Sequence, residues 1–396
     1  MAYFCVTLNP PFLLKTFDII ATTLYGLEEI LAQEIRQLGV ADVTILNRAV
    51  KFQGNLETLY KANLLLRTAV KILKPIHAFR ATNENQLYSG IKNMNWEEYL
   101  TIKKSFAIDA AVHSSFFTHS LYVALKSKDA IVDLYREKYK LRPSVNTENP
   151  DLRINVHISE SMVIVSLDSS GSTLGKRNYR LEQGDAPINE ILAAAIILTA
   201  EWDKKVDFID PMCGSGTFSI EAALIAANIA PGRNRQFTFQ TWLDYDAQLF
   251  ERVKAEADDK IVPIKAKIRA LDIDKKAINM AISNARRAGV REFITFEGKD
   301  FFETELPNGE GIVVINPPYD ERLHVDKVED FYDEIGSHLK HKYHGCEAWI
   351  ISSNFDALKR FGLKPSKKIK LFNGSLECRL LKYELYEGSR KMSNPE

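Results

Sequence analysis

Two segments of the sequence combine residue types that are suited to chemistry. The first, residues 206–223 (VDFIDPMCGSGTFSIEAA), is an apolar run that ends at Asp210 and passes through a glycine turn into a helix-like stretch. The second, residues 311–319 (GIVVINPPY), is an apolar run that ends at Asn316 and two prolines. In each segment polar groups directly follow a strand-like run, which is where ligands bind in open α/β sheets.

The glycine turn predicts a site for a nucleoside cofactor. Gly214 and Gly216 would let backbone amides approach a ligand at the start of a helix. A dinucleotide turn has a third glycine three positions after the second, but Ser219 stands there. This departure disfavours a pyrophosphate cofactor and favours S-adenosylmethionine. Asp210 is expected to face the amino group of that cofactor; the alternative is an acid that only caps the next helix.

The next strand-like run ends at Asp272, which we expect to accept hydrogen bonds from both ribose hydroxyls of the cofactor. The 56 residues between Gly216 and Asp272 are unusually many for such a fold, so an insertion over residues 231–266 is expected to fold aside. Asp274 is an alternative carboxylate that would simply cap the following helix.

After the third strand-like run, Asp300 is positioned to accept from the amino group of the cofactor's adenine. Phe301 or Phe302 would either cover the adenine ring or belong to the core. Cys213 is expected to pack rather than to act as a nucleophile, because a direct transfer needs no covalent intermediate.

The Asn-Pro-Pro-Tyr segment predicts how an amino group could be made reactive. The two prolines hold the backbone rigid after the strand. The side-chain oxygen of Asn316 and the carbonyl of Pro317 can both accept from a conjugated amino group, which directs its lone pair at a sulfonium methyl. Tyr319 could stack on the base that carries this amino group. The predicted chemistry is methyl transfer to an exocyclic base nitrogen.

These motifs require an alternating α/β domain to position them. A helix is predicted over residues 188–202, with Pro187 in its first turn, and strands alternate with helical stretches beyond it, which predicts a parallel, doubly wound sheet. Asn373-Gly374 marks a two-residue hairpin near the end, so an antiparallel strand is expected there. The predicted strands cover residues 206–210, 267–272, 294–297, 311–316, 348–352, 367–372 and 375–386.

The N-terminal part predicts two smaller α+β units. The first has strands at residues 17–21, 43–46 and 49–52, and helices at 26–38 and 55–73. The second has a strand at 105–112, a helix at 120–139, and paired strands at 153–159 and 162–168. Residues 169–186, rich in basic residues and glycine, are interpreted as an exposed linker. Its Lys176, Arg177 and Arg180 would bind RNA phosphates, or would be a solvated surface.

Composition limits the class of protein. The formal net charge is zero, but residues 1–180 carry 22 Lys+Arg and 17 Asp+Glu, which is compatible with contact to phosphates. The four cysteines form no CxxC pair and the eight histidines show no metal-ligand spacing, so neither a disulfide framework nor a metal site is expected. No apolar run is long enough to span a bilayer. We expect a cytoplasmic protein with no membrane partner.

At this point the motifs resemble a known family. Residues 206–223 together with INPPYDERL are similar to the THUMP-domain RNA guanine-N2 methyltransferases, specifically the bacterial RlmL family that modifies 23S rRNA. PDLRINVHI, SLDSSG and GKRNYR are similar to the end of a THUMP domain and its exit, and NGSLECRL to the closing hairpin.

The resemblance implies a fold and a set of site residues. The fold class is α/β, with a C-terminal Rossmann-like class I methyltransferase domain of mostly parallel sheet and an antiparallel terminal hairpin, after N-terminal α+β ferredoxin-like and THUMP domains. The implied domains are ferredoxin-like at 1–72, RNA-binding THUMP at 73–168, linker at 169–186 and methyltransferase at 187–396. The implied cofactor residues are Asp210, Met212, Cys213, Gly214, Ser215, Gly216, Asp272, Ile273, Asp300 and Phe301, and the implied catalytic residues are Asn316, Pro317 and Tyr319.

The sequence departs from the family pattern at two positions, where Asn178 and Asp320 stand in place of glycines. Asn tolerates a positive φ, so the first change is mild. Asp320 adds a negative charge beside the expected base pocket. Some relatives carry a second, fused methyltransferase domain, and this sequence is expected to lack it.

Three other functions stay open. A tRNA guanine-N2 methyltransferase would have a similar layout. A methyltransferase of adenine in DNA, or of glutamine in protein, would share the Asn-Pro-Pro-Tyr segment but not the expected RNA-binding half. A noncatalytic RNA-binding factor for ribosome assembly would have no use for both motifs.

Overall fold

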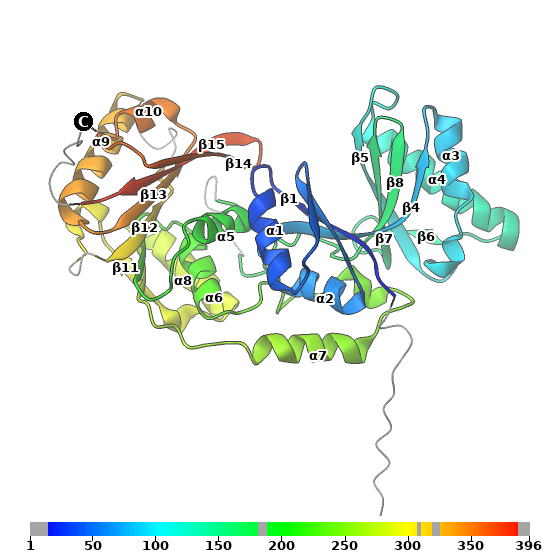
Figure 1. Ribbon diagram of the computed structural model, residues 1–396, viewed down its shortest axis with the longest axis horizontal. Coiled ribbons are helices and arrows are strands. Elements are labelled where there is room, and N and C mark those ends of the chain that lie inside the picture. Colours follow the sequence, from blue (N-terminus) through cyan, green and yellow to red (C-terminus); the bar gives the residue numbers. More distant parts are fainter. Residues whose placement is uncertain (1–14, 181–187, 307–309, 319–324, 387–396) are drawn as a thin grey trace, which may run out of the picture. The chain divides into compact units, whose positions relative to one another are not determined.

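A computed structural model describes residues 15–180, 188–306, 310–318 and 325–386 of the chain (Figure 1). The chain divides into two compact units. Unit 1 comprises Met1–Thr23, Leu31–Leu174 and Gly232–Ala257, and unit 2 comprises Leu24–Ile30, Gly175–Pro231 and Asp258–Glu396. Both units are discontinuous in sequence, whereas the sequence predicted continuous domains at 1–72, 73–168 and 187–396 with a linker at 169–186.

Unit 1 is built on one eight-stranded sheet with the order β2-β3-β1-β4-β8-β7-β5-β6. Its neighbours pair antiparallel except β5 with β6 and β5 with β7, which are parallel. The strands are β1 (Phe17–Thr23), β2 (Val43–Leu46), β3 (Ala49–Gly54), β4 (Ala69–Arg80), β5 (Ser105–His113), β6 (Ser144–Val145), β7 (Leu152–Ser159) and β8 (Met162–Asp168). The helices that precede or follow them are α1 (Glu28–Gln37), α2 (Leu56–Leu65), α3 (Glu84–Lys92), the 3-10 turn η2 (Trp96–Glu98) and α4 (Ser120–Tyr139).

Strand β4 corrects the sequence-based prediction of one helix over residues 55–73. Helix α2 ends at Leu65, and the backbone amides of Arg67 and Thr68 donate to the carboxylate of Glu34 at 2.8 and 2.9 Å instead of continuing the helix. The strand that follows pairs with β1 up to Leu73 and with β8 from Leu73 onward. The domain boundary expected between residues 72 and 73 therefore falls inside a strand that both halves of the sheet share.

Of the segment predicted as an exposed linker, the described residues 169–180 are largely packed. Ser169 and Ser170 are buried against β4 of unit 1, where the Ser169 hydroxyl donates to the carbonyl of Ile72 and the Ser170 hydroxyl accepts from the Ile72 amide. Leu174 and Tyr179 are also buried. The glycine- and serine-rich composition is explained by tight packing rather than by exposure.

The insertion after the glycine turn folds into unit 1. Phe239 stacks on Tyr60 with ring centroids 4.4 Å apart, and Phe250 lies edge-on to Phe239 at 5.0 Å. The guanidinium of Arg235 donates to the carbonyls of Ser172 and Thr173 at 2.9 and 2.8 Å. The insertion contains the 3-10 turn η3 (Thr238–Thr241) and helix α7 (Ala247–Asp258).

Unit 2 is built on a seven-stranded sheet with the order β11-β10-β9-β12-β13-β15-β14. The first five strands of this order are parallel, and β15 joins antiparallel between β13 and β14. The predicted Rossmann-like sheet with an antiparallel terminal hairpin is thus confirmed. The strands are β9 (Asp207–Asp210), β10 (Ile268–Asp272), β11 (Ile294–Gly298), β12 (Gly311–Ile315), β13 (Glu347–Ser352), β14 (Lys367–Asn373) and β15 (Leu376–Glu384).

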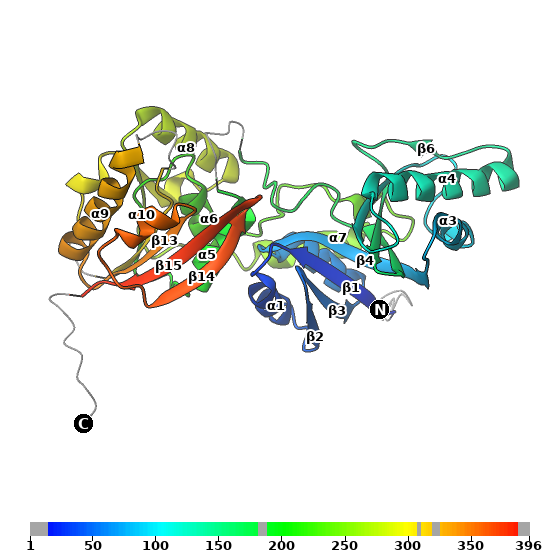
Figure 2. The same cartoon turned by 90° about the horizontal axis from the view of Figure 1, so that it is seen from above.

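Helices cover both faces of this sheet (Figures 1 and 2). Helices α5, α6 and α8 lie against one face, and α9 packs on the other through Val328, Tyr332, Ile335 and Leu339. Every residue of α6 is buried, so the helix behind the glycine turn is fixed on all sides. The helical elements are α5 (Glu190–Thr199), α6 (Thr217–Ala226), α8 (Lys275–Ala288), η4 (Arg291–Phe293), η5 (Phe301–Glu303), α9 (Val325–Lys342) and α10 (Phe355–Lys359).

Among the described residues, no helix combines the length and the apolar character needed to cross a membrane.

The aromatic cluster around Phe239 should carry much of the stability of unit 1. Phe239 is fully buried, so Phe239→Ala should lower the free energy of unfolding by roughly 3–5 kcal/mol. Leu243→Ala, in the same insertion but 48% exposed, should change it by less than about 0.5 kcal/mol. Urea denaturation of both variants measures the difference. Equal losses would contradict the packing of the insertion into unit 1.

Candidate active site

Strand pairing in unit 2 brings the two sequence motifs to one edge of the sheet. Central strand β9 pairs parallel with β10 on one side and with β12 on the other. The carboxyl ends of parallel strands meet at the same edge. Asp210, at the end of β9, therefore lies between the segments that end in Asp272 and Asn316. This arrangement is the one that the predicted cofactor and amine sites require.

The glycine turn has the backbone geometry of a tight ligand loop. Gly214 and Gly216 have φ of +52° and +80°, conformations that L side chains rarely adopt. A Cβ at Gly216 would lie 2.9 Å from the Cβ of Ala281, so a side chain would collide with α8. A Cβ at Gly214 would meet nothing within 4 Å, so the backbone there borders open space.

Asp272, the last residue of β10, is hydrogen-bonded to this turn. Its carboxylate accepts from the Gly214 amide and from the Asp274 amide, both at 2.9 Å. Asp274 caps α8 by accepting from the Lys276 amide at 2.8 Å, which is the alternative foreseen for it. Ile273, between the two acids, is 71% exposed. An exposed apolar side chain beside a carboxylate suits the predicted contact with a nucleoside.

Asp210 is a buried carboxyl with one unpaired oxygen. Its Oδ2 accepts from the hydroxyl and the amide of Ser219 at 2.8 and 3.3 Å, whereas its Oδ1 is buried without a hydrogen-bond partner. Burial raises the pKa of Asp210 to about 7, against the opposing effect of the Ser219 hydrogen bonds. The bond to the first turn of α6 fits the helix-capping alternative. The unpaired Oδ1 fits a carboxylate that can also bind a cationic group of a ligand.

The remaining predicted cofactor residues lie either in the glycine turn or directly after β11. Met212 and Ser215 are half-buried in the turn. Cys213 is buried, and burial raises the pKa of its thiol well above the usual range, so it packs as expected. Asp300 accepts from the Phe302 amide at 3.0 Å. Phe301 is only 3% exposed within the core next to α9, which fits the core alternative foreseen for it rather than a place over the adenine ring.

The amine site is described as far as Pro318. Asn316 is half-buried and Pro317 is buried, directly after β12. The predicted base-stacking residue Tyr319, and Asp320 beside it, lie outside the described residues.

The predicted RNA contacts of the linker are corrected for two of three residues. The Arg177 side chain is 2% exposed, and its Nε lies 3.4 Å from the carboxylate of Glu221, which is fully buried in α6. The Tyr179 hydroxyl donates to the same carboxylate at 3.2 Å. Arg180 donates to the Thr217 hydroxyl at 2.7 Å and lies 3.5 Å from Glu190. These arginines are thus held by acids and by the first turn of α6.

Two positions of the linker agree with the expectations. Lys176 is exposed, so its contact with phosphate stays a prediction. Asn178 has φ of +64°, the left-handed conformation that Asn was expected to tolerate in place of the family's glycine.

The sequence analysis did not predict two buried side chains that form hydrogen bonds around the glycine turn. Ser219 was noted only as a missing glycine, and Asn284 of α8, whose amide donates to the Ser215 carbonyl at 3.0 Å, was not noted at all. A polar residue at a buried helical position was the available signal for both.

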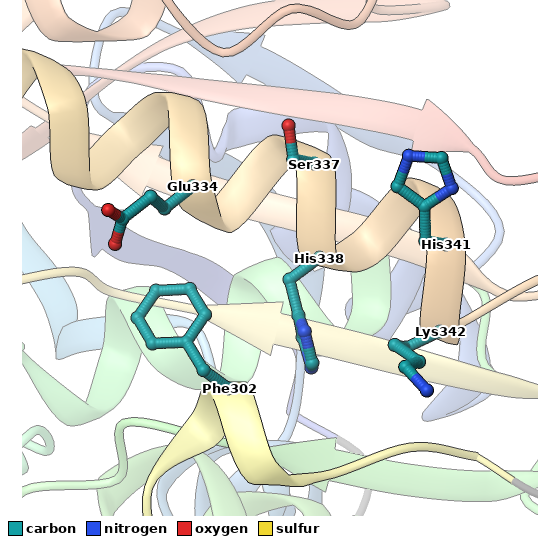
Figure 3. Close-up of a pocket in the computed structure, with 6 residues that line it drawn as sticks. All are labelled: Phe302, Glu334, Ser337, His338, His341 and Lys342. Atoms are coloured by element: carbon teal, nitrogen blue, oxygen red, sulfur yellow. The ribbon is translucent and has the colours of Figure 1, made fainter.

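A separate groove of about 410 Å³ lies between η5 and α9 (Figure 3). Phe302 and His338 face each other across it with ring centroids 5.6 Å apart. His338 is already bonded to the Thr304 carbonyl at 2.8 Å, and burial lowers its pKa. Apart from Phe302, the predicted site residues do not line this groove, so we do not assign the ligand to it. Its lining residues are Phe302, Glu334, Ser337, His338, His341 and Lys342.

Within the described ranges, no group of three or more His, Cys, Asp or Glu side chains is arranged to hold a metal ion.

The strand order, the glycine turn and the two acids that follow β9 and β10 define a class, the Rossmann-like methyltransferases that use S-adenosylmethionine. The family models agree. The RMKL-like methyltransferase domain (UPF0020) matches residues 177–382, the THUMP domain 81–168 and the RlmL ferredoxin-like domain 18–73. The chain belongs to the RMKL-like methyltransferase family, as the resemblance indicated.

Individual relatives support this membership. The ribosomal RNA large subunit methyltransferase K/L of Syntrophotalea carbinolica is 40% identical over 93% of this chain, which covers 53% of that protein. The chain thus spans about half the length of that relative. A Synechocystis sp. protein named as an RNA methyltransferase is 38% identical, over 92% of this chain and 96% of its own.

A solved structure supports the cofactor. SMU.472, assigned as a methyltransferase and crystallised with SAH, is 34% identical and has a TM-score of 0.85, over 95% of this chain and 100% of its own. SAH is what S-adenosylmethionine becomes when it gives up its methyl group, so the predicted cofactor is confirmed.

The buried ion pair between Arg177 and Glu221 of α6 allows a test of whether the linker is held by packing. Arg177→Ala would leave Glu221 buried without its cation, so the free energy of unfolding should fall by roughly 3–5 kcal/mol. Lys176→Ala, the exposed neighbour, should change it by less than about 0.5 kcal/mol. Thermal and urea denaturation measure both. A similar small effect of the two variants would show that the ion pair does not hold the linker.

Proposed function

We propose that this chain transfers a methyl group from S-adenosylmethionine to the exocyclic N2 of a guanine in 23S rRNA. The observation that carries the proposal is the parallel pairing of β9 with β12, which puts the ends of the two motif-bearing strands side by side. A cofactor turn and an amine-accepting loop on neighbouring strands are the two parts that such a transfer needs.

Three carboxylates at this edge of the sheet would contact the cofactor. Asp210, with its unpaired Oδ1, would receive the cofactor's ammonium group. Asp272 would exchange its bonds to backbone amides for the ribose hydroxyls, with Ile273 against the nucleoside. Asp300 would accept from the adenine amino group. When bound, S-adenosylmethionine supplies an electrophilic methyl on its sulfonium.

The residues after β12 prepare the nucleophile. The side-chain oxygen of Asn316 and the carbonyl of Pro317 accept the two N–H donors of the guanine amino group. This draws the nitrogen out of conjugation and aims its lone pair. The nitrogen forms the bond to carbon, the electron pair of the carbon–sulfur bond stays on sulfur, and one N–H proton leaves to water. No general base of high pKa is required.

The assignment of the substrate rests on the relatives and on the N-terminal half. The relatives are named as large-subunit rRNA or RNA methyltransferases, and residues 81–168 match the THUMP domain, which in our sequence interpretation binds RNA. A tRNA guanine is the second candidate, because the same layout would serve it. The two are separated by experiment rather than by any residue described above.

The pKa of Asp210 predicts a pH dependence of cofactor binding. With a pKa of about 7 in the cofactor-free protein, the carboxyl is mostly ionised at pH 7.5 and mostly protonated at pH 6. Because an ammonium group pairs only with the ionised form, the affinity for S-adenosylmethionine should fall about tenfold over this interval. Calorimetric titration measures it. Asp210→Asn should bind weakly and without this pH dependence; an unchanged pH profile in the variant would remove Asp210 from the ammonium site.

The amine site is tested by Asn316→Ala. Loss of one positioning acceptor should lower kcat about 100-fold or more, while the dissociation constant of S-adenosylmethionine stays within twofold. Mass spectrometry of nucleosides from separated 23S rRNA and tRNA, isolated from cells with and without the gene, measures the product. N2-methylguanosine that disappears from 23S rRNA supports the proposal. Retained turnover of Asn316→Ala, or loss of a methyladenosine instead, would overturn it.

A further inference from the structure

Helix α8 carries a strongly basic, acid-free surface that the cofactor and amine sites do not use. Its four charged residues, Lys275, Lys276, Arg286 and Arg287, are all basic and all exposed. Within the described part of the chain, none of the four has a carboxylate within 4 Å. By contrast, two other exposed basic residues of unit 2, Lys359 and Arg360, are paired with Asp356 and Glu329. We call these four side chains the α8 basic face.

The spacing of the α8 basic face forms two matching pairs. Eleven residues separate Lys275 from Arg286 and likewise Lys276 from Arg287, which is close to three helical turns, so each pair lies on one side of the helix about 16 Å apart along its axis. The opposite side, with Ile278, is buried on the sheet. The charges therefore form a stripe along the exposed length of the helix.

The two lysines are placed against the preference of the helix itself. Cations in the first turn are opposed by the positive end of the helix dipole, typically by about 0.3–1 kcal/mol each; the N-cap carboxylate of Asp274, which accepts from the Lys276 amide at 2.8 Å, offsets part of this cost. Helices α1, α2, α3 and α5 each carry an acid in the first turn, whereas α4, α6 and α7 carry none. Capping by Asp274 explains where the helix starts but does not require cations at Lys275 and Lys276, which an external anion would stabilise.

The face begins at the edge of the sheet that holds the candidate active site. Helix α8 starts three residues after Asp272. The side chain of Lys275 lies over the backbone of Gly298 at the end of β11, where an added Cβ would be 3.6 Å from the Lys275 Cγ. Asn284 joins the same helix to the glycine turn. A polyanion held along α8 would thus be fixed relative to the cofactor turn.

We propose that the α8 basic face binds the phosphate backbone of the RNA that carries the target base. This inference rests on the proposed function. It assigns the phosphate contact to the methyltransferase domain, in place of the buried linker arginines.

Salt-dependent binding tests the proposal. Each phosphate contact lowers the slope of log K against log salt by about 0.7–0.9. The variant K275Q/K276Q/R286Q/R287Q should therefore lose roughly three units of slope on transcribed 23S rRNA between 50 and 300 mM KCl. Its affinity for S-adenosylmethionine and its Tm should match the wild type.

The matched control removes the same charge elsewhere in unit 2. K359Q/R360Q/K367Q/K368Q combines two paired residues with two exposed lysines on edge strand β14, where lysines commonly block edge-to-edge pairing. Its slope should change by less than one unit. Equal changes in the two variants, or an unchanged slope in the α8 variant, would overturn the inference. If the wild type itself neither binds nor methylates the RNA, the proposed function fails with it.

Discussion

The parallel pairing of β9 with its two neighbours is the constraint on which the functional part of the structure depends. Asp210, Asp272 and Asn316 are separated by 62 and 44 residues along the chain, yet each lies at, or directly after, the carboxyl end of one of three adjacent strands. Hydrogen bonds from the turn to the second strand, such as the Cys213 amide to the Leu271 carbonyl at 2.8 Å, then fix the loop itself. The order of the strands therefore brings these residues together, and the side chains then determine what the site can bind.

Behind that edge, buried polar groups determine how firmly the turn is held. Arg180 contacts the first residue of helix α6, and Arg177 contacts Glu221 one turn later. Asp210 accepts from Ser219 in the same helix, and Asn284 donates to Ser215 in the turn. Such groups are costly to bury unless paired. Their concentration around one turn indicates that its exact shape, rather than general stability, is what they maintain.

Much of this could be predicted from the sequence because the signals were local. Strand-like runs ending in Asp210, Asp272 and Asn316, and the Asn373-Gly374 turn, specify their own geometry within a few residues. Strand β4 was missed because its alternation begins directly after a helix, and its pairing with β1 and β8 depends on distant residues. The role of Arg177 was missed for the same reason: its partner Glu221 lies 44 residues away, and an arginine in a glycine-rich stretch carries no local mark of burial.

The return of residues 232–257 to unit 1 has a consequence for the way the chain folds during synthesis. Phe239 and Phe250, which pack on Tyr60, are synthesised only after the glycine turn and α6. The N-terminal half therefore cannot complete its core before part of the C-terminal half has been made. Cutting the gene at residue 187 would leave Tyr60 without Phe239 in one fragment and an uncovered aromatic loop in the other. The two units are therefore interdependent in assembly even though each has its own sheet.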